Sequence, residues 1–550
     1  MPQSLIAQEL EEVVVTAELI EKSVLQLPNS VSVIDNANIE RRQARQLEDL
    51  LNLAPNVNSA SGASRGRFIQ IRGIGERSEF QEPINSSVGV ILDGIDLTGI
   101  SLGATTLDLQ QLEVLRGPQG TLYGANALAG LLNLVSNNPS SEYQGQFDLA
   151  VEDFDGMEIG GYVSGPISEH TGYRLAVKQF TSDGFIDNVF LDRDDTNNID
   201  ELSARLKVVS QVNERTQVSS TLFLADVDNG YDAFSLDNTR ITYSDQPGED
   251  TQRTAAFAVR TQHERDENNS VDVLISHANS KLGYSYDEDW SHIGICNNTA
   301  CDSSLFGFDW FYSSTDEYQR NNKNTTIDAK WLHHGANTQW VAGLYHRSQT
   351  IDLTRLYTYN EADFESQLST DNSAMYGQLN VDLNSVWALV VGGRLERRSN
   401  RYGDTDNAQA NPKESLWGGK VALEYRPNNN DFYYALLSRG YKPGGFNLDG
   451  AIDPELREYD TETMLNYELG YKSTWLNNSL SFQAALFYQD RIDIQSKQSI
   501  VASIASGAVG GLCPCSFTDF TANATSGSNK GIEVELSFAA SEQLTVYASL

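Results

Sequence analysis

Apolar and polar residues alternate along most of the chain after about residue 143. Gly377, Leu379 and Val381 fall on one face of an extended segment, while Gln378 and Asn380 fall on the other. Successive side chains of a β-strand point to opposite faces of a sheet, so this period of two predicts strands. Similar alternation returns in the segments 419–425, 431–437, 463–472 and 480–487. The sequence therefore predicts one long series of antiparallel strands.

The connections between these strands differ in length from one to the next. Strands of roughly ten residues are joined alternately by tight turns, such as Asn384-Ser385, and by long polar loops, and aromatic residues gather near strand ends. These features are typical of outer-membrane barrels. We count about 17 strands, and the predicted fold class is a membrane all-β protein, a large antiparallel transmembrane β-barrel. A soluble solenoid or propeller is the alternative, but no fixed repeat period is evident.

Residues 1 to about 142 follow another pattern, in which short helices and strands are mixed. The segment Asn36–Leu53 has apolar residues at helical spacing and stops at Ala54-Pro55, which predicts a helix ended by proline. A short apolar strand over Ser87–Leu92 is closed by an Asp93-Gly94 turn. This part of the chain therefore predicts a separate α+β domain.

Composition narrows the range of partners and sites. The formal net charge is −36, from 75 acidic and 39 basic residues, and the acidity is spread along the chain. Such a charge repels phosphate backbones, so we expect no nucleic-acid partner. His333, His334 and His346 lie on neighbouring predicted strands, where girdle or loop positions suit them better than a metal or haem site. We expect no metal, no cofactor and no catalytic constellation.

The four cysteines form two close pairs, Cys296/Cys301 and Cys513/Cys515. A zinc site usually needs two C-x2-C-like pairs or nearby histidines, and these spacings differ from that pattern. Disulfides in exposed loops, in an oxidising compartment, are the better interpretation. The connectivity stays open: a bridge across Pro514 alone is strained, and a link between the two loops is the other arrangement.

The two ends of the sequence suggest that further segments belong to the protein. Met1–Gln8 lacks a charged region followed by an apolar core, so it does not form a complete export signal. The last predicted strand, Thr545–Leu550, breaks off with an odd strand count, whereas single-chain bacterial barrels have an even number. We therefore expect an export signal and C-terminal strands beyond this sequence.

Four signatures follow one another in the first part of the chain. The β-branched run within Glu11–Ala17 comes first, and Ile71–Gly75, Val90–Ile95 and Leu112–Gly124 follow it. Together and in this order they resemble the TonB-dependent receptors, and the resemblance covers essentially the whole chain. It implies a barrel of about 22 strands in the family, filled by an α+β plug domain. The implied divisions are an N-terminal segment with a TonB box at 1–20, the plug at 21–142 and the barrel at 143–550.

The resemblance implies that the box binds TonB through Glu12, Val13, Val14, Val15, Thr16 and Ala17. A β-branched run near a free chain end can add as an extra strand to the sheet edge of a partner. Such a run taken alone is more often an ordinary edge strand. Its position ahead of the other signatures favours the TonB interpretation.

Arg72 and Arg116 match two plug arginines that, in the family, pair with glutamates of the inner barrel wall. The matching strand motifs carry Glu468 and Glu533. Alternation independently points both glutamates inward, because their neighbours are apolar residues suited to lipid. A buried arginine–carboxylate cluster is geometrically specific, and we predict that it latches the plug closed. Ordinary structural salt bridges without a gating role are the alternative.

The resemblance also implies active import of a scarce ligand across the bacterial outer membrane. The expected ligand is a ferric siderophore complex; an oligosaccharide or cobalamin is the alternative, and a passive porin or adhesin is the alternative of another class. The expected partners are TonB, outer-membrane lipid and lipopolysaccharide, and the extracellular ligand. The segment Ser438–Asn447 predicts either a ligand contact or a glycine-rich bend leaving the membrane.

Overall fold

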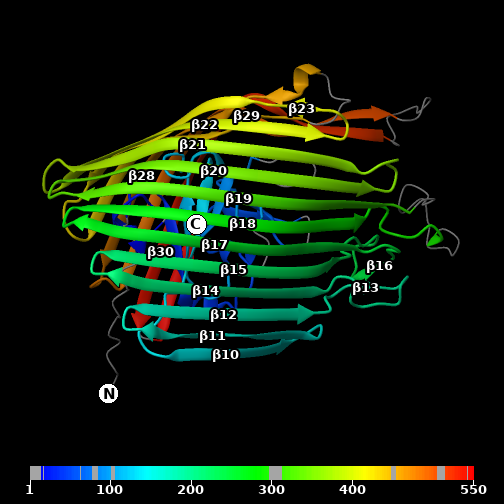
Figure 1. The fold of residues 1–550 in the computed structure, drawn as a ribbon, viewed down its shortest axis with the longest axis horizontal. Helices are drawn as coiled ribbons and strands as arrows, with labels where there is room; N and C mark the ends of the chain where they lie inside the picture. The colour runs from blue at the N-terminus through cyan, green and yellow to red at the C-terminus, as the bar shows by residue number, and fades with distance from the viewer. Residues whose placement is uncertain are drawn as a thin grey trace.

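The computed structural model is a wall of antiparallel strands curved around an inner domain (Figure 1). We call the inner domain, residues 22–136, the plug. No helix among the described residues has the length and apolar character needed to cross a membrane. The structure describes residues 14–16, 18–20, 22–61, 64–76, 85–100, 106–295, 313–447, 454–503, 515–541 and 543–550.

Eighteen strands form the barrel wall, and each pairs antiparallel with the next along the chain. One of them, β23, has only two residues, so 17 long strands remain and the predicted membrane all-β fold is confirmed. In the part of the chain that the structure describes, no ladder joins β10 to β31. The wall strands are β10 (Gln144–Glu152), β11 (Gly156–Ser168), β12 (Thr171–Ser182), β14 (Ile199–Asn213), β15 (Thr216–Tyr231), β17 (Gly248–Asp266), β18 (Asn269–Asp287), β19 (Thr315–His334), β20 (Thr338–Tyr357), β21 (Phe364–Asp382), β22 (Trp387–Asp404), β23 (Gln409–Ala410), β24 (Lys413–Tyr425), β25 (Asp431–Lys442), β28 (Glu462–Trp475), β29 (Leu480–Ser503), β30 (Cys515–Ser541) and β31 (Leu544–Ser549).

Many wall strands are longer than the roughly ten residues that the sequence predicts. Strands β19 to β22 have 18 to 20 residues, and β29 and β30 have 24 and 27. Backbone pairing continues where the outward side chains have turned polar, so the apolar signal ends before the strand does. Short elements lie beyond the wall strands, at the end of the barrel opposite the short turns. They are β13 (Asp187–Asn188), β16 (Ile241–Thr242), β26 (Gly445–Phe446), η4 (Pro454–Leu456) and β27 (Glu458–Tyr459).

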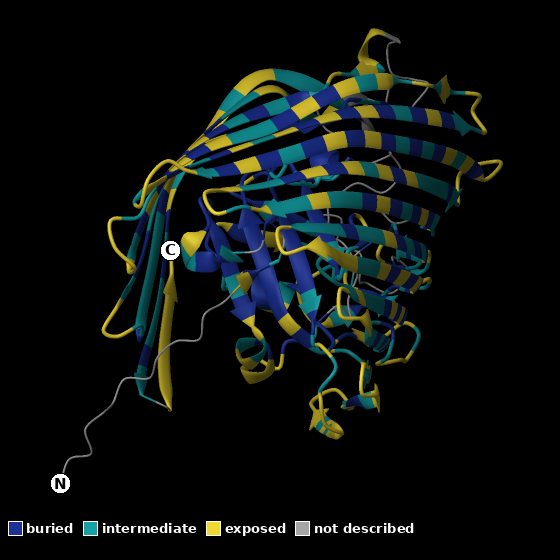
Figure 2. Cartoon of the chain, turned by 60° about the vertical axis from the view of Figure 1, so that its left-hand side comes forward, coloured by how far each residue is buried: buried dark blue, intermediate teal, exposed yellow. Residues whose placement is uncertain are grey.

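The outer face of the wall is an apolar belt. Buried and exposed residues alternate along most of the wall strands (Figure 2), and Glu468 is buried between Tyr467 and Leu469, which are 48% and 60% exposed. Large apolar side chains exposed in water are costly, but lipid accommodates them. The belt includes Leu224, Phe257, Ile275, Ile327, Leu344, Met375, Val391, Leu395, Val421, Leu437, Leu486 and Ile532.

Aromatic side chains border this belt at the end of the barrel where short turns join the wall strands. Trp387 and Tyr425 lie 4.5 Å apart, between the start of β22 and the end of β24. Trp475 stacks on Phe482 at 5.6 Å beside the next such turn. Amphipathic rings favour the interface between lipid and water, so the structure confirms the aromatic clusters predicted near strand ends.

The plug is built around a five-stranded sheet with the order β3-β8-β9-β6-β7. Strands β6 and β9 are parallel and the other pairs antiparallel. The turn between β6 and β7 is Asp93-Gly94, as the sequence predicts, and both residues have positive φ. The elements are β1 (Val14–Val15), β2 (Lys22–Ser23), η1 (Val24–Gln26), β3 (Val31–Asp35), α1 (Asn36–Arg41), α2 (Glu48–Leu51), β4 (Val57–Ala60), β5 (Phe68–Ile71), β6 (Val88–Leu92), β7 (Ile95–Asp96), β8 (Leu109–Arg116), η2 (Gly124–Asn126) and β9 (Gly130–Ser136).

The single helix predicted over residues 36–53 is wrong, because the structure has two short helices there, α1 and α2. Gln43 adopts a left-handed φ of 51°, which a continuous helix cannot contain. The carboxylate of Asp49, within α2, accepts hydrogen bonds from the backbone N–H groups of Arg45 and Gln46 and so fixes the residues that lead into the second helix. The apolar spacing survives this break, since Ile39, Leu50 and Leu51 are all buried.

The plug touches the wall in two chemically different ways. Small and apolar side chains of β15, β17 and β18 share one hydrophobic core with the plug residues Leu92, Ile95 and Leu97. These wall residues, which we call the apolar contact, are Phe223, Ala225, Ala256, Ala258 and Ala278. Charged side chains of β28 and β30 meet two plug arginines instead, and we call this region the ionic contact.

Candidate functional site

The ionic contact centres on Arg72 of the plug. Its Nε lies 2.8 Å from Glu533 Oε1, and its Nη2 donates to Glu533 Oε2 at 2.9 Å and to Glu468 Oε2 at 3.0 Å. The side chains of Arg72 and Glu468 are fully buried, and that of Glu533 is 2% exposed. One guanidinium thus binds two strands of the wall, and its planar array of donors suits two carboxylates.

A tight turn aims Arg72 at the wall. Arg72 and Gly73 have φ of 56° and 76°, between Ile71 and Ile74, whose backbones exchange hydrogen bonds. Left-handed φ costs little at glycine but is uncommon at arginine, so surrounding contacts must hold it. Asn529 of β30 does so by donating from Nδ2 to the Arg72 carbonyl at 2.9 Å.

Arg116 adds a second guanidinium at the end of β8. Its Nη2 donates to Glu535 Oε1 at 2.7 Å, and its Nε lies 3.0 Å from Glu533 Oε2 without the alignment of a hydrogen bond. Glu533 therefore faces both arginines. The sequence analysis named Arg72, Arg116, Glu468 and Glu533, and the structure brings all four together. The sequence analysis missed Glu535. Glu533 and Glu535 are two residues apart on β30, so their side chains lie on the same face of the wall.

Hydroxyl and amide groups complete the hydrogen bonding of these carboxylates. Ser30 Oγ and the Tyr434 hydroxyl donate to Glu468 Oε1 at 2.9 and 2.8 Å. Ser32 Oγ donates to Glu535 Oε1 at 2.6 Å, and Asn56 Nδ2 to Glu533 Oε1 at 3.2 Å. Buried charges are tolerated only when paired and hydrogen-bonded, and these are both.

The electrostatics of the cluster keep the arginines charged. Burial by itself lowers the pKa of Arg72, but the negative charges of Glu468 and Glu533 outweigh it and raise that pKa above its ordinary value. Burial also lowers the pKa of Arg116, and Glu533 and Glu535 likewise reverse the effect. Both arginines therefore keep the positive charge that pairs with these carboxylates.

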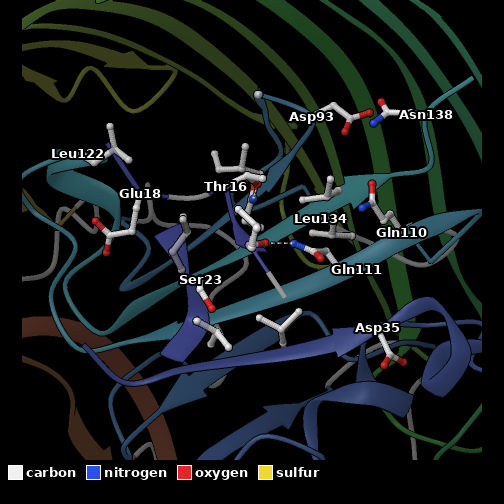
Figure 3. Close-up of a pocket in the computed structure, with 18 of the residues that line it drawn as sticks. Thr16, Glu18, Ser23, Asp35, Asp93, Gln110, Gln111, Leu122, Leu134 and Asn138 are labelled. Carbon is white, nitrogen blue, oxygen red and sulfur yellow. Dashed lines mark hydrogen bonds between the residues drawn. The ribbon is translucent and has the colours of Figure 1, made fainter. Parts of the chain in front are cut away.

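The N-terminal segment lies against the plug at the end of the wall that carries the short turns. We call residues 14–23 the N-terminal strap. Val14 and Val15 pair with Ser23 and Lys22 in a two-stranded ladder. Thr16 donates from its backbone N and its hydroxyl to Glu113 Oε1, at 2.8 and 2.9 Å. Gln111 Nε2 donates to the Val14 carbonyl at 2.9 Å, the dashed line beside Gln111 in Figure 3.

The strap also reaches the barrel wall. Leu19 and Ile20 pack on Val341 and Tyr376 of β20 and β21. Glu18 Oε2 lies 2.9 Å from Lys420 Nζ of β24. The strap therefore bridges the plug and the wall. Of the predicted TonB-binding residues, Val14, Val15 and Thr16 belong to it, while Glu12, Val13 and Ala17 lie outside the described residues.

A cavity of about 2730 Å³ separates the plug from part of the wall. It opens among the short turns, where Ser385, Asn429 and Asn478 line it, and reaches Asp96, Arg347 and Glu396 midway along the barrel. Val14, Thr16, Glu18 and Ser23 of the strap form part of its lining (Figure 3). The strap thus forms part of the boundary of this cavity.

Other predicted positions lie away from these features. Cys296, Cys301 and Cys513 fall outside the described residues, and of Cys515 only the backbone is described, at the start of β30. The segment Ser438–Asn447 touches the plug: Lys442 Nζ donates to Glu76 Oε1 at 2.7 Å, and Asn85 Nδ2 donates to the carbonyls of Pro443 and Gly444. Among the described residues, no three His, Cys, Asp or Glu side chains are grouped to hold a metal ion.

Comparison with known proteins gives two family matches. Residues 23–131 match the TonB-dependent Receptor Plug Domain, and residues 170–550 match the TonB dependent receptor-like beta-barrel. The second match alone covers more than half of the 550 residues.

Individual relatives are distant. The chain is 22% identical to a pesticin receptor of Yersinia enterocolitica over 482 residues, which cover 82% of this chain and 65% of that protein. It is 20% identical to the vitamin B12 transporter BtuB of Photobacterium profundum, over 69% of this chain and 58% of that one. The ferric yersiniabactin uptake receptor FyuA from Yersinia pestis superimposes with a TM-score of 0.76 at 18% identity, over 95% of this chain and 79% of that chain. The chain thus spans about 65% of the length of the first of these relatives.

Proposed function

The chain belongs to the TonB-dependent receptors of the bacterial outer membrane, and from that premise we propose that it imports a ferric siderophore. The family consists of receptors and transporters, so we assign the chain no catalytic step. Uptake of ferric yersiniabactin by FyuA supports the ligand class. Cobalamin is the second ligand to test, because the similarity to BtuB extends over 69% of the chain.

The observation that carries the proposal is the position of the N-terminal strap. Val14 and Val15 pair with β2 in a two-residue ladder, and Gln111 donates to the Val14 carbonyl. The Val15 side chain is buried in a small apolar cluster with Val24 and Leu115. A partner that adds a strand along Val13–Ala17 competes directly with β2 for the same backbone groups. We infer that this partner is TonB and that its binding frees the strap from the plug.

A pull on the strap leads along the chain to the ionic contact. The strap continues through η1 into β3, and Ser30 and Ser32 at the start of β3 donate to Glu468 and Glu535. Lys472 of the wall also donates from Nζ to the Val24 carbonyl at 2.7 Å. We infer that the arginine–glutamate cluster holds the plug until this pull disturbs it, because directional contacts weaken steeply when their geometry changes.

The proposal is tested by uptake of radioactive iron from a panel of ferric siderophores, with labelled cobalamin and oligosaccharides alongside. Val14→Pro removes a backbone N–H that an added strand needs, so we expect TonB-dependent uptake to be lost. Val14→Ile keeps the β-branched strand and should retain uptake. Equal uptake by the two variants would show that TonB does not bind this segment. Uptake that persists in cells without TonB would indicate a passive porin.

A further inference from the structure

The cavity extends around the plug at the end of the wall that carries the short turns, and one part of it runs inward beside strands β19 to β22. Its inner end is formed by the β6–β7 turn of the plug and by strands β19 to β22 of the wall. Ligand pockets in proteins are usually about 300–1,000 Å³. The cavity, at about 2730 Å³, is therefore large enough to hold a small organic complex together with water.

The wall at this inner end has hydrogen-bonding groups that no described residue uses. Thr326 Oγ1, Asn372 Oδ1 and Arg394 Nη2 have no hydrogen-bond partner, and the three residues are 5%, 3% and 2% exposed. All three residues line the cavity. Buried polar groups are nearly always paired, so three unpaired ones on neighbouring strands point to a partner other than this chain. Thr326 lies on β19, Asn372 on β21 and Arg394 on β22, and a donor and acceptors on one stretch of wall suit the carboxylate or hydroxyl groups of a polar organic molecule.

One plug–wall contact crosses the inner end. Asp96 of β7 lies 2.9 Å from Arg347 of β20, and Asn324 of β19 accepts from Arg347 Nε and donates to the Asp96 carbonyl, both at 3.1 Å. Asp96 and Arg347 are 9% and 4% exposed. This contact stands between the cavity and the half of the barrel that carries the long loops. The strap bounds the cavity at the opposite end.

We propose that this cavity is a transit site, in which an imported polar chelate bearing carboxylate or hydroxyl groups pauses beside Thr326, Asn372 and Arg394. The chelate enters when the Asp96–Arg347 contact parts and leaves when the strap is withdrawn. The inference rests on the proposed import function and adds a route to it.

The contact at the inner end is tested without any ligand, by the ion current of the purified protein in a planar bilayer. Asp96→Asn and Arg347→Gln each weaken a charge-assisted contact, and we expect open-channel events to rise by about tenfold. Arg355→Gln is the matched control, because Arg355 lies on the same strand and binds Asp316 of the wall at 2.8 Å. The inference would be overturned if the Asp96 and Arg347 variants, shown to be folded by circular dichroism, gave no more open-channel events than the unmodified protein. It would also be overturned if the Arg355 variant raised these events as much as the Asp96 and Arg347 variants do.

The transit site itself is tested by blocking it. Thr326→Cys, modified with a bulky maleimide, should lose uptake of every chelate that the unmodified variant imports, while cross-linking to TonB continues. Ser276→Cys is the control, since Ser276 is equally buried on β18 and does not line the cavity. Uptake that survives modification at Thr326 contradicts the route. Failure of the unmodified protein to import any chelate contradicts the proposed function instead, and the current measurement still decides the route.

Discussion

Two of the surfaces that hold the plug in its barrel obey different physics. At the apolar contact, alanines and Phe223 of the wall pack on leucine and isoleucine side chains of the plug. At the ionic contact, two arginines meet three glutamates. Apolar burial is non-directional and tolerates small shifts, whereas a buried charge left without its partner is strongly destabilising. A small displacement of the plug therefore costs more free energy at the ionic contact than at the apolar contact.

The largest expected effect comes from Glu533, the one glutamate that faces both arginines. Glu533→Ala leaves Arg72 and Arg116 short of countercharge, and we expect the plug to lose about 3–5 kcal/mol of stability. The free energy of plug unfolding, measured by denaturant titration in detergent, checks this value. Arg116→Ala should act in the same direction and raise permeability to large antibiotics.

The matched control for Glu533 is an ion pair that lacks burial. Arg253 and Asp226 are 3.2 Å apart on the outer face, with side chains 76% and 47% exposed. Such pairs contribute about 0–1 kcal/mol, so Asp226→Ala should hardly change the unfolding. Equal losses in the two variants would show that burial is not what distinguishes the ionic contact.

The apolar contact should respond to volume. Ala278 is 1% exposed in the shared core of plug and wall. Ala278→Leu overfills this space, and we expect a loss of about 1–3 kcal/mol. Ala278→Gly, which adds no volume, is the control for a change at the same site. Unfolding in detergent with and without added salt separates the two contacts, and an unchanged midpoint for the leucine variant would mean that the plug is not tightly packed here.

The smallest effect concerns the ion pair between Glu76 of the plug and Lys442 of the wall. Burial by itself raises the pKa of Glu76, but Lys442 and Ser87 outweigh it and bring the pKa below its ordinary 4.5. Because the folded-state pKa is the lower one, this contact stabilises at neutral pH and is lost as the pH falls below about 4.5. Glu76→Gln should cost about 1 kcal/mol at pH 7 and flatten the acid limb of stability against pH. Parallel pH profiles for the two proteins would contradict this assignment.

The sequence predicts the wall better than it predicts the plug. Alternation identifies strand faces because each strand is buried on one side only, and the inward position of Glu468 follows directly from it. In the plug, the break at Gln43 depends on a local left-handed conformation and on the Asp49 side chain, for which apolar spacing has no signal.

The site divides in the same way. Arg72 and Arg116 stand in recognisable motifs. The alternation along β30 also predicts that Glu535 faces inward, as Glu533 does. The cavity and the unpaired groups at Thr326, Asn372 and Arg394 depend on which parts of the wall the plug leaves uncovered. That is a property of two packed surfaces, and no single segment encodes it.

The length of β30 has a consequence for the first encounter with solutes. Its 27 residues span about 90 Å at ~3.3 Å per residue, whereas the apolar band of an outer-membrane barrel is about 25 Å tall. Even at a strand tilt of about 40°, much of β29 and β30 stands clear of the lipid on the side opposite the short turns (Figure 1). The paired ends of these two strands extend beyond the outer surface of the membrane, so diffusing molecules meet them before they reach the plug.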